Sequence, residues 1–205
     1  MSHNSEYIYY RTDHHWTARG AYYAYSAFCE TKGITPTPLN SFERYEFDGF
    51  LGTLYEKAQR PSSLSKTPDT VEAFVPNGTN KMTIFDNNGN ANSNYEIVCT
   101  YTDRMYQNAA SKYNCFIAGD NPLTKIHNTN KNDGSTVIIV KESYGNAFVP
   151  FLVDSYEYVY VIDYRYWNGS LKDAVIEYNA DDVIFLSVIN ATSGTRVEKL
   201  KEIIK

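Results

Sequence analysis

The sequence lacks several features that would assign it to a class directly. Its three cysteines, Cys29, Cys99 and Cys115, are too few and too widely spaced for a zinc ribbon or a redox C-x-x-C motif. No apolar run reaches the roughly 18 residues of a membrane-spanning helix, and no signal peptide opens the chain. The 19 basic residues are scattered among 24 acidic ones, which argues against nucleic acid as a partner. The chain is then either a cytosolic protein or the soluble part of an exported one whose leader lies outside this sequence.

Tyrosine, in contrast, is abundant, with 19 residues in 205. This composition suits a polar, aromatic-rich surface that contacts carbohydrate, and it suits half-buried strands equally well. The length favours a single domain, residues 1–205, with one sizeable core. An odd number of cysteines leaves at least one thiol unpaired, while Cys99 and Cys115 lie in two strand-like segments and can pair if the protein is exported.

The chain from residue 135 onward alternates apolar strands with helices. Strands are expected over residues 135–140, 158–162 and 183–189, and helices over 145–152, 171–178 and 196–204. This alternation is typical of a parallel sheet covered by helices on both faces. Ligands of such sheets bind beyond the carboxyl ends of the strands, so functional residues are expected just after each strand.

Residues 69–118 have a different character. Short β-prone runs are separated by the hairpin signals Asn77-Gly78 and residues 87–90. They predict a small antiparallel β insertion within the domain.

The densest group of chemically active side chains is Asp-His-His-Trp at residues 13–16. A helix is expected over residues 18–32, with Thr17 as its N-cap. Asp13 and His15 are therefore expected on a loop that enters a helix, where catalytic groups concentrate.

A serine follows the first apolar strand. Ser143 lies between the strand at 135–140 and the helix at 145–152, where backbone N–H groups and the helix dipole point at an oxyanion. This position suits a nucleophile, and it equally suits a helix cap. Arg165 and Asn190 follow the other two strands, where they can donate to a carbonyl or take part in ordinary loop contacts.

Taken together, residues 13–16, 142–152 and 163–166 resemble the bacterial DHHW proteins, relatives of the SGNH-hydrolase-like proteins that O-acetylate alginate in the bacterial envelope. The resemblance extends over about residues 10–189. It implies an α/β fold, a three-layer α/β/α sandwich with a mainly parallel sheet, in which the Asp-His block precedes the serine and so reverses the usual SGNH order. Roles in such triads depend on geometry and not on chain order.

The resemblance also implies roles for single residues. The Asp, His and Trp of the family's D-x-H-W block correspond to Asp13, His15 and Trp16, and the nucleophile corresponds to Ser143. Glu142 stands before Ser143 where relatives usually carry Asp. Oxyanion or substrate contacts are expected from Tyr144, Asn146, Tyr164, Arg165, Asn190 and Trp16.

The leading hypothesis is a serine-dependent acyl-ester hydrolase or O-acetyltransferase. Its partner would be an acetylated polysaccharide of the cell envelope or the extracellular space, and other envelope polysaccharide-modifying proteins are candidate partners. We expect an extracytoplasmic monomer that needs no cofactor and no metal, with a leader or membrane anchor outside this sequence.

Two other functions remain open. The first is a non-catalytic glycan-binding module on the same fold, which the departure at Glu142 permits. The second is a metal-dependent phosphoesterase, because Asp-His-His also marks a group of manganese enzymes; such sites need further aspartates, and residues 1–12 contain none. His14 is expected to face away from the site in a surface or helix-capping role.

Overall fold

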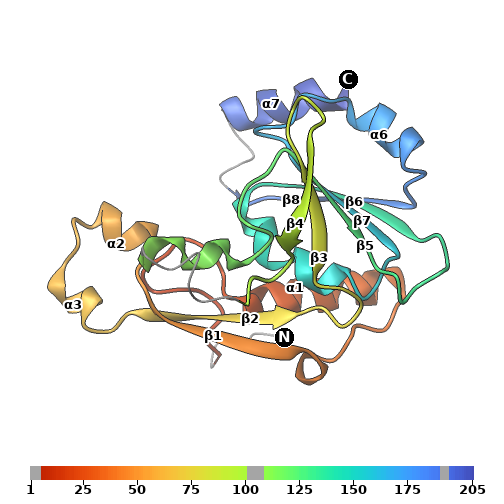
Figure 1. Cartoon of the computed structure of the whole chain (residues 1–205). Helices are drawn as coiled ribbons and strands as arrows, with labels where there is room; N and C mark the ends of the chain where they lie inside the picture. Colours follow the sequence, from red (N-terminus) through yellow and green to blue (C-terminus); the bar gives the residue numbers. More distant parts are fainter. Residues whose placement is uncertain (1–5, 101–108, 190–193) are drawn as a thin grey trace.

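The computed structural model describes residues 6–100, 109–189 and 194–205. Two sheets are formed, a six-stranded sheet in the order β4-β3-β5-β7-β6-β8 and a two-stranded sheet, β1-β2 (Figure 1). The strands are β1 (Glu43–Phe50), β2 (Asp69–Val75), β3 (Lys81–Phe85), β4 (Ala91–Glu96), β5 (Leu123–His127), β6 (Thr136–Lys141), β7 (Tyr158–Asp163) and β8 (Asp182–Leu186). The helices are α1 (Ala18–Lys32), α2 (Thr53–Lys57), α3 (Ser62–Ser65), α5 (Val149–Leu152), α6 (Leu171–Glu177) and α7 (Thr195–Ile204), with 3-10 helices η1 (Leu39–Ser41), η2 (Ala109–Cys115) and η3 (Ser143–Ala147).

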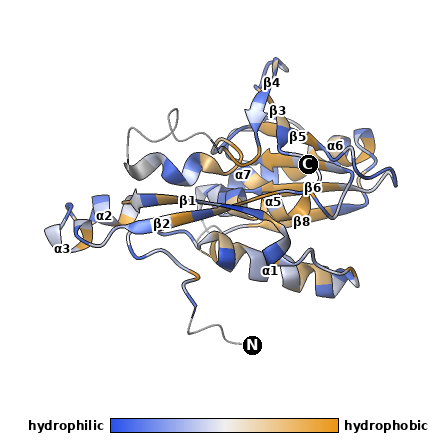
Figure 2. Ribbon diagram, turned by 60° about the horizontal axis from the view of Figure 1, so that its bottom comes forward, coloured by the Kyte–Doolittle hydropathy of each residue, from blue (hydrophilic) through white to orange (hydrophobic). Residues whose placement is uncertain are grey.

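Strand β6 lies inside the main sheet and is buried at every residue. It pairs in parallel with β7 and β8, whereas β5, β3 and β4 extend the sheet through antiparallel pairs. Hydrophobic residues line the central strands between the layers of helices (Figure 2). A strand covered on both faces has no solvent side, which explains the unbroken apolar run in the sequence.

Helices cover both faces of the main sheet, as a three-layer sandwich requires. The core on one face includes Tyr25 of α1 and Phe151 of α5, whose rings lie 5.8 Å apart. The core on the other face includes Leu171 of α6 and Ile203 of α7. The α/β sandwich predicted from the sequence is confirmed, but the sheet is mixed, with three of its five strand pairs antiparallel.

Helix α1 has the boundaries that the sequence predicts. The Thr17 hydroxyl accepts a hydrogen bond from Gly20 N–H, and Gly33 ends the helix in the left-handed region at φ 71°. The buried residues of this helix, which include Ala21 and Cys29, recur at helical spacing. The cap fixes where the helix begins, and therefore where residues 13–16 lie.

The predicted insertion at residues 69–118 is divided between the two sheets. Strand β2 pairs with β1, whereas β3 and β4 form a hairpin that extends the main sheet beside β5. The turn of this hairpin is closed by Asp86, whose carboxylate accepts from Asn88 N–H and Asn90 N–H. The polar sequence of β4 fits an edge strand, which the turn signals alone could not reveal.

The segment predicted as one helix over residues 145–152 forms two short helices that begin at Ser143. The 3-10 helix η3 begins directly at Ser143, and α5 follows with Pro150 in its first turn. Proline fits the first turn because its missing N–H has no partner there, so the direction of the chain can change at this point.

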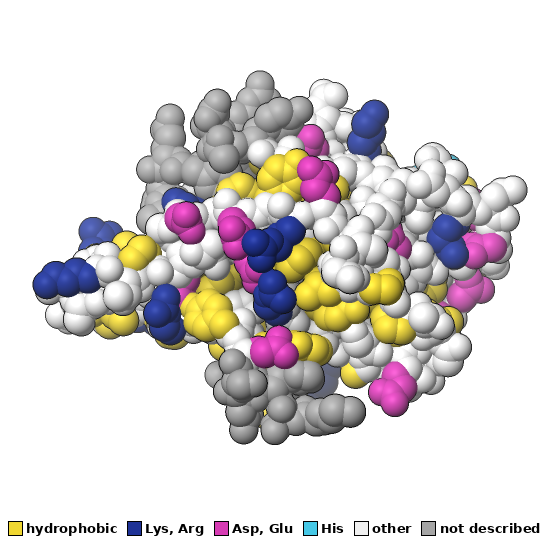
Figure 3. Space-filling view, turned by 90° about the horizontal axis from the view of Figure 1, so that it is seen from below, with side chains coloured by type: hydrophobic (Ala, Val, Ile, Leu, Met, Phe, Trp, Pro, Cys, Tyr) yellow, Lys and Arg dark blue, Asp and Glu magenta, His cyan; other side chains and the backbone are white. Residues whose placement is uncertain are grey.

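The molecular surface has scattered charge. The face seen from below mixes hydrophobic, basic and acidic side chains (Figure 3). Arg19 and Arg44 pair with Glu72, at 2.6 and 2.9 Å. Among the described residues, no helix combines the length and apolar character needed to cross a bilayer. Cys29 and Cys115 are free thiols, and Cys99 N–H donates to the Cys115 carbonyl, so Cys99 and Cys115 lie on neighbouring segments.

Candidate functional site

The structure brings the loop before α1 and the turn after β6 into contact. His15 Nδ1 lies 2.5 Å from Asp13 Oδ1, and His15 Nε2 lies 2.8 Å from Ser143 Oγ. Asp13 and His15 are buried, at 4% and 6% exposure, and Ser143 is half-buried. One imidazole thus joins a carboxylate to a hydroxyl that remains accessible.

The carboxylate of Asp13 is held from its other side by the start of α2. Thr53 donates to Asp13 Oδ2 through its backbone N–H at 2.8 Å and its hydroxyl at 3.1 Å. Gly52 permits this approach, because a Cβ there would lie 2.3 Å from Asp13 Cβ. Thr53 is a site residue that sequence reasoning missed; the Gly-Thr pair before a short helix is the available signal, since helix N-termini bind carboxylates.

The surroundings of Asp13 keep it ionised. Burial acts to raise the pKa of Asp13, but the hydrogen bond and charge of His15, together with Thr53 N–H, hold this pKa well below its ordinary value. The accepting carboxylate fixes the proton of neutral His15 on Nδ1, which leaves the Nε2 lone pair directed at Ser143.

Besides the contact of His15 with Ser143, two hydrogen bonds join the two halves of the site, and Tyr113 of η2 contacts both halves. Trp16 Nε1–H donates to the Tyr144 carbonyl at 3.0 Å, and the Tyr144 hydroxyl donates to the His14 carbonyl. The Tyr113 hydroxyl donates to the Ser143 carbonyl at 3.1 Å. The ring of Tyr113 also stacks on the His15 imidazole, with centroids 4.0 Å apart and planes at 12°. These contacts fix the position of the loop before α1 relative to the serine turn.

Glu142 is buried beside the serine. Its Oε1 accepts from Val188 N–H at 2.8 Å, and its Oε2 lies 3.2 Å from Ser143 Oγ and 3.4 Å from Tyr144 N. The Ser143 hydroxyl, with one proton, therefore has a second acceptor besides His15. The glutamate ties the serine turn to the segment after β8.

His14 lies over the site and not away from it. Its side chain is 40% exposed, and its ring centroid is 3.9 Å from that of His15. His14 Nδ1 lies 2.5 Å from Thr53 Oγ1. Because the Thr53 hydroxyl proton goes to Asp13, this oxygen accepts from Nδ1–H of His14. Burial and the charge of His15 lower the pKa of His14.

Three of the predicted oxyanion or substrate contacts are engaged elsewhere. Asn146 is 1% exposed and bonds Lys141 and Asp120. Arg165 pairs with Asp163 through two contacts of 2.9 and 2.6 Å. Tyr164 is buried in the core beneath α6 and α7. The sequence placed these residues at the correct sheet edge, but Asp120 accepts from Asn146 and Asp163 accepts from Arg165.

Two other predicted contacts lie at the site, and one is not described. Trp16 and Tyr144 border His15, with ring centroids 5.6 Å apart. Asn190 falls outside the described residues.

Asp13, His14 and His15 are, within the described part of the chain, the group whose ligand atoms lie close enough to consider a metal, all within 4.8 Å. Ligands of zinc lie about 2.0–2.2 Å from the ion. Two such atoms held by one ion are further apart than the 2.5 Å between His15 Nδ1 and Asp13 Oδ1. The arrangement fits proton transfer and does not fit an ion between these two atoms.

The residues just before Asp13 are held by Asp69, which is fully buried at the start of β2. Asp69 accepts from Thr12 N–H at 2.8 Å, from the Thr12 hydroxyl at 2.5 Å and from Arg11 Nε at 3.0 Å, and the Tyr7 hydroxyl also donates to it. Burial acts to raise the pKa of Asp69, but these hydrogen bonds outweigh it and lower the pKa.

The chain is similar to one protein family and to several solved structures. The family model described as DHHW protein matches residues 1–162. A crystal structure of a DHHW family protein from Eubacterium siraeum DSM 15702 is similar, with 34% identity and a TM-score of 0.87, and the match covers 97% of this chain and 65% of that one. No curated protein matches the sequence.

Two structures of Bacillus cereus PatB1 share the fold at lower identity. The structure with a sulfonyl adduct is 19% identical and the other is 20% identical, each with a TM-score of 0.70 and each covering 93% of this chain. The matches cover 63% and 65% of those chains, so this chain spans less than two thirds of the length of the structures it matches.

The lowered pKa of Asp69 predicts a pH-dependent stability. Ionised Asp69 stabilises the fold at neutral pH, and this contribution is lost as the pH falls below about 4 and through the lower folded pKa. We expect Asp69→Asn to lower the free energy of unfolding at neutral pH by about 1–3 kcal/mol. The deficit relative to wild type should shrink towards about pH 2 in urea unfolding series. The exposed Glu30→Gln serves as control, and a deficit independent of pH would contradict the assignment.

Proposed function

The chain belongs to the DHHW protein family, and from that premise we propose that it is a serine-dependent enzyme that hydrolyses or transfers O-acetyl groups of a cell-envelope or extracellular polysaccharide. The observation that carries the proposal is the position of His15 Nε2, 2.8 Å from Ser143 Oγ, with Asp13 on the other ring nitrogen. Nucleophile, base and orienting acid at such distances are the arrangement that acyl transfer needs.

The first half-reaction forms an acetyl-serine. His15 Nε2 takes the hydroxyl proton as Ser143 Oγ attacks the ester carbonyl, and Asp13 stabilises the imidazolium that results. The tetrahedral intermediate collapses, the ester C–O bond breaks, and the imidazolium returns its proton to the leaving alkoxide. Tyr113, stacked on the ring of His15, presents a π face to the transient positive charge.

The second half-reaction removes the acetyl group. Neutral His15 now takes a proton from water or from a sugar hydroxyl, which attacks the acetyl-serine carbonyl. The bond from the acetyl carbon to Ser143 Oγ then breaks, and the imidazolium returns its proton to Ser143 Oγ. Water makes the protein an esterase, and a sugar hydroxyl makes it a transferase. The geometry of the described residues suits both acceptors.

Oxyanion stabilisation is assigned to backbone N–H groups of the serine turn. Gly145 N–H donates to the Glu142 carbonyl at 2.9 Å, so it is engaged within the turn. Tyr144 N–H makes only a long contact with the Glu142 carboxylate, 3.4 Å, and is the better candidate beside the N–H of Ser143. Loss of one such donor typically lowers the rate by about 100-fold to 1000-fold.

Aromatic rings around Ser143 support a sugar as the group that carries the ester. Tyr9 is 55% exposed and pairs with Trp16 through its backbone. Flat amphipathic rings of this kind offer both apolar area and hydrogen bonds to a pyranose. The proposal extends to an extracytoplasmic monomer with an acetylated polysaccharide as its partner.

One observation favours the second candidate, a non-catalytic glycan-binding module. Glu142 Oε2 is 3.2 Å from Ser143 Oγ and competes with His15 for the single hydroxyl proton. A serine that donates to Glu142 is not activated by His15. The reactivity of Ser143 therefore separates the two functions.

A sulfonyl fluoride is the suitable probe, because it reacts with activated hydroxyls and PatB1 is described with a sulfonyl adduct. We expect rapid labelling of Ser143, found by peptide mass spectrometry, and none in Ser143→Ala. His15→Ala and Asp13→Asn should each slow the labelling by about 100-fold or more, the usual contribution of a positioned base. Ser62→Ala, which changes an exposed serine of α3, should react like wild type. A folded wild-type protein that stays unlabelled would sink the enzyme proposal.

Trp16 is assigned to alignment of the site through its bond to the Tyr144 carbonyl. Trp16→Phe should slow the labelling of Ser143 by about two- to tenfold, the equivalent of one hydrogen bond. The KM for 4-nitrophenyl acetate should not change. Trp167→Phe, the matched change at the other tryptophan, should have no effect. If only the KM for an acetylated oligosaccharide rises, Trp16 stacks on sugar and the alignment role is wrong.

A further inference from the structure

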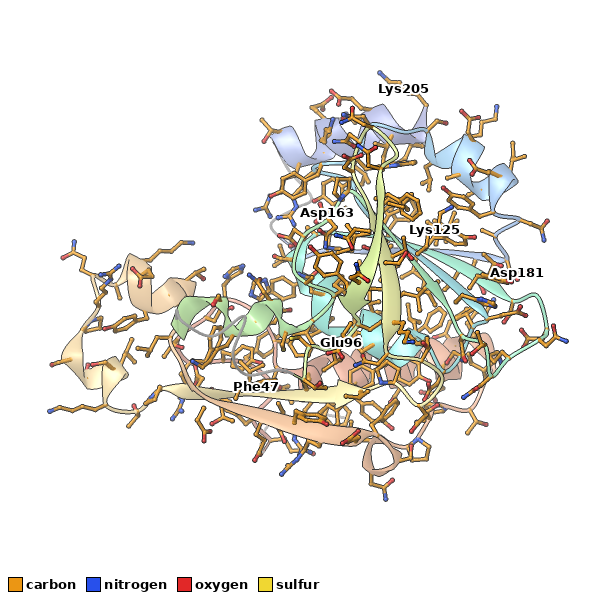
Figure 4. All side chains as sticks on the ribbon, viewed as in Figure 1. Phe47, Glu96, Lys125, Asp163, Asp181 and Lys205 are labelled. Atoms are coloured by element: carbon orange, nitrogen blue, oxygen red, sulfur yellow. The ribbon has the colours of Figure 1, made fainter. Side chains whose placement is uncertain are left out.

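An ionic cluster that the proposed mechanism does not use runs from the interior beneath the serine turn, at Lys141 and Asp163, to the exposed Asp120. Lys141 and Asp163 are both fully buried, and Lys141 Nζ contacts Asp163 Oδ2 at 3.1 Å and Asp120 Oδ1 at 3.2 Å. Arg165 pairs with the same two carboxylates, at 2.6 and 2.8 Å. Figure 4 shows Asp163 at the end of β7, inside the molecule. The two aspartates carry two negative charges, and Lys141 and Arg165 carry two positive charges, so the cluster is formally neutral.

Asn146 is clamped at both ends of its amide by this cluster. Its Oδ1 accepts from Lys141 Nζ at 2.7 Å, and its Nδ2–H donates to Asp120 Oδ1 at 3.1 Å. An ammonium only donates and a carboxylate only accepts, so the orientation of the amide is fixed. Lys141 and Asp120 also bond each other, which closes a ring of three hydrogen bonds.

This ring controls the turn that carries Ser143. Ser143 and Asn146 lie one turn apart in η3, so a rotation of this short helix about its axis moves both side chains together. Between them, Gly145 lies directly on the stem of Lys141, because a Cβ there would be 2.5 Å from Lys141 Cβ. The turn therefore rests on Lys141 and is held against rotation at Asn146.

We propose that Asn146, held between Lys141 and Asp120, is a positioning residue that sets the rotation of η3 and so keeps Ser143 Oγ on His15 Nε2. Its catalytic meaning rests on the proposed function. Buried ion pairs contribute little net stability compared with apolar packing of the same volume, so a geometric role accounts better for such a cluster under an apolar strand end.

The test compares two variants of the cluster. Asn146→Leu keeps the branching at Cγ and removes both hydrogen bonds of the amide, whereas Arg165→Gln removes the ion pairs of Arg165 with Asp120 and Asp163 without changing Asn146. Labelling of Ser143 by the sulfonyl fluoride is measured per folded molecule, with urea unfolding of each variant. We expect Asn146→Leu to slow labelling by about 100-fold, since a misplacement of about 1 Å has effects of this size. Arg165→Gln should lose stability but label close to the wild-type rate.

Crystal structures of wild type and Asn146→Leu provide a readout that does not require activity. We expect the distance from Ser143 Oγ to His15 Nε2 to lengthen beyond hydrogen-bond range, about 3.5 Å, in the variant alone. If wild type fails to label but this displacement occurs, the proposed function is wrong and the positioning role stands. A variant that keeps both the contact and the labelling rate overturns the positioning role. Should Asn146→Leu not fold, Asn146→Ser removes the same bonds with a smaller side chain.

Discussion

The hydrogen bond between His15 Nε2 and Ser143 Oγ, 2.8 Å long, is the contact on which the arrangement of this protein depends. It joins a loop near the start of the described chain to a turn about two thirds of the way along it. Neither segment determines the position of the other through local structure. Tertiary contacts must therefore supply the alignment, and the structure has a separate device for each half.

The loop half is fixed by the N-cap of α1 on one side and by Asp69 on the other. The serine half is fixed by the end of β6 and by the ring of Lys141, Asn146 and Asp120. Both devices use buried charge with several hydrogen bonds. A charge in a low-dielectric interior tolerates few alternative geometries, because each unmade bond there is expensive. Buried charge at this site thus favours a single conformation and lowers the net stability.

Sequence reasoning could predict the parts of this architecture whose signals are local. Thr17 as a cap, the apolar run of β6 and Ser143 at a strand-to-helix turn depend on neighbours within a few residues. The protein partners of Asn146 and Arg165 could not be predicted in this way. Asn146 bonds Asp120, which comes from a loop whose path only the folded chain reveals, and Arg165 pairs with Asp120 as well as with its near neighbour Asp163.

Two other features of the structure could not be predicted from the sequence for the same reason. Thr53 reaches Asp13 across 40 positions of sequence, and no periodicity announces that contact. The division of residues 69–118 between two sheets depends on which partner strand each edge meets, and hairpin signals report only the turn. Patterns within a short stretch of sequence predict helices and strands and their order. The hydrogen bonds that orient the site join residues that are far apart in the sequence.

The most direct measurement is the covalent state of the protein during turnover of 4-nitrophenyl acetate, with the reaction quenched in acid and the peptides mapped by mass spectrometry. We predict an acetyl group on Ser143 in wild type that is absent from Ser143→Ala and strongly reduced in His15→Ala. Turnover at the wild-type rate by Ser143→Ala, or an acetyl group found only on residues other than Ser143, would contradict a nucleophilic role for this serine.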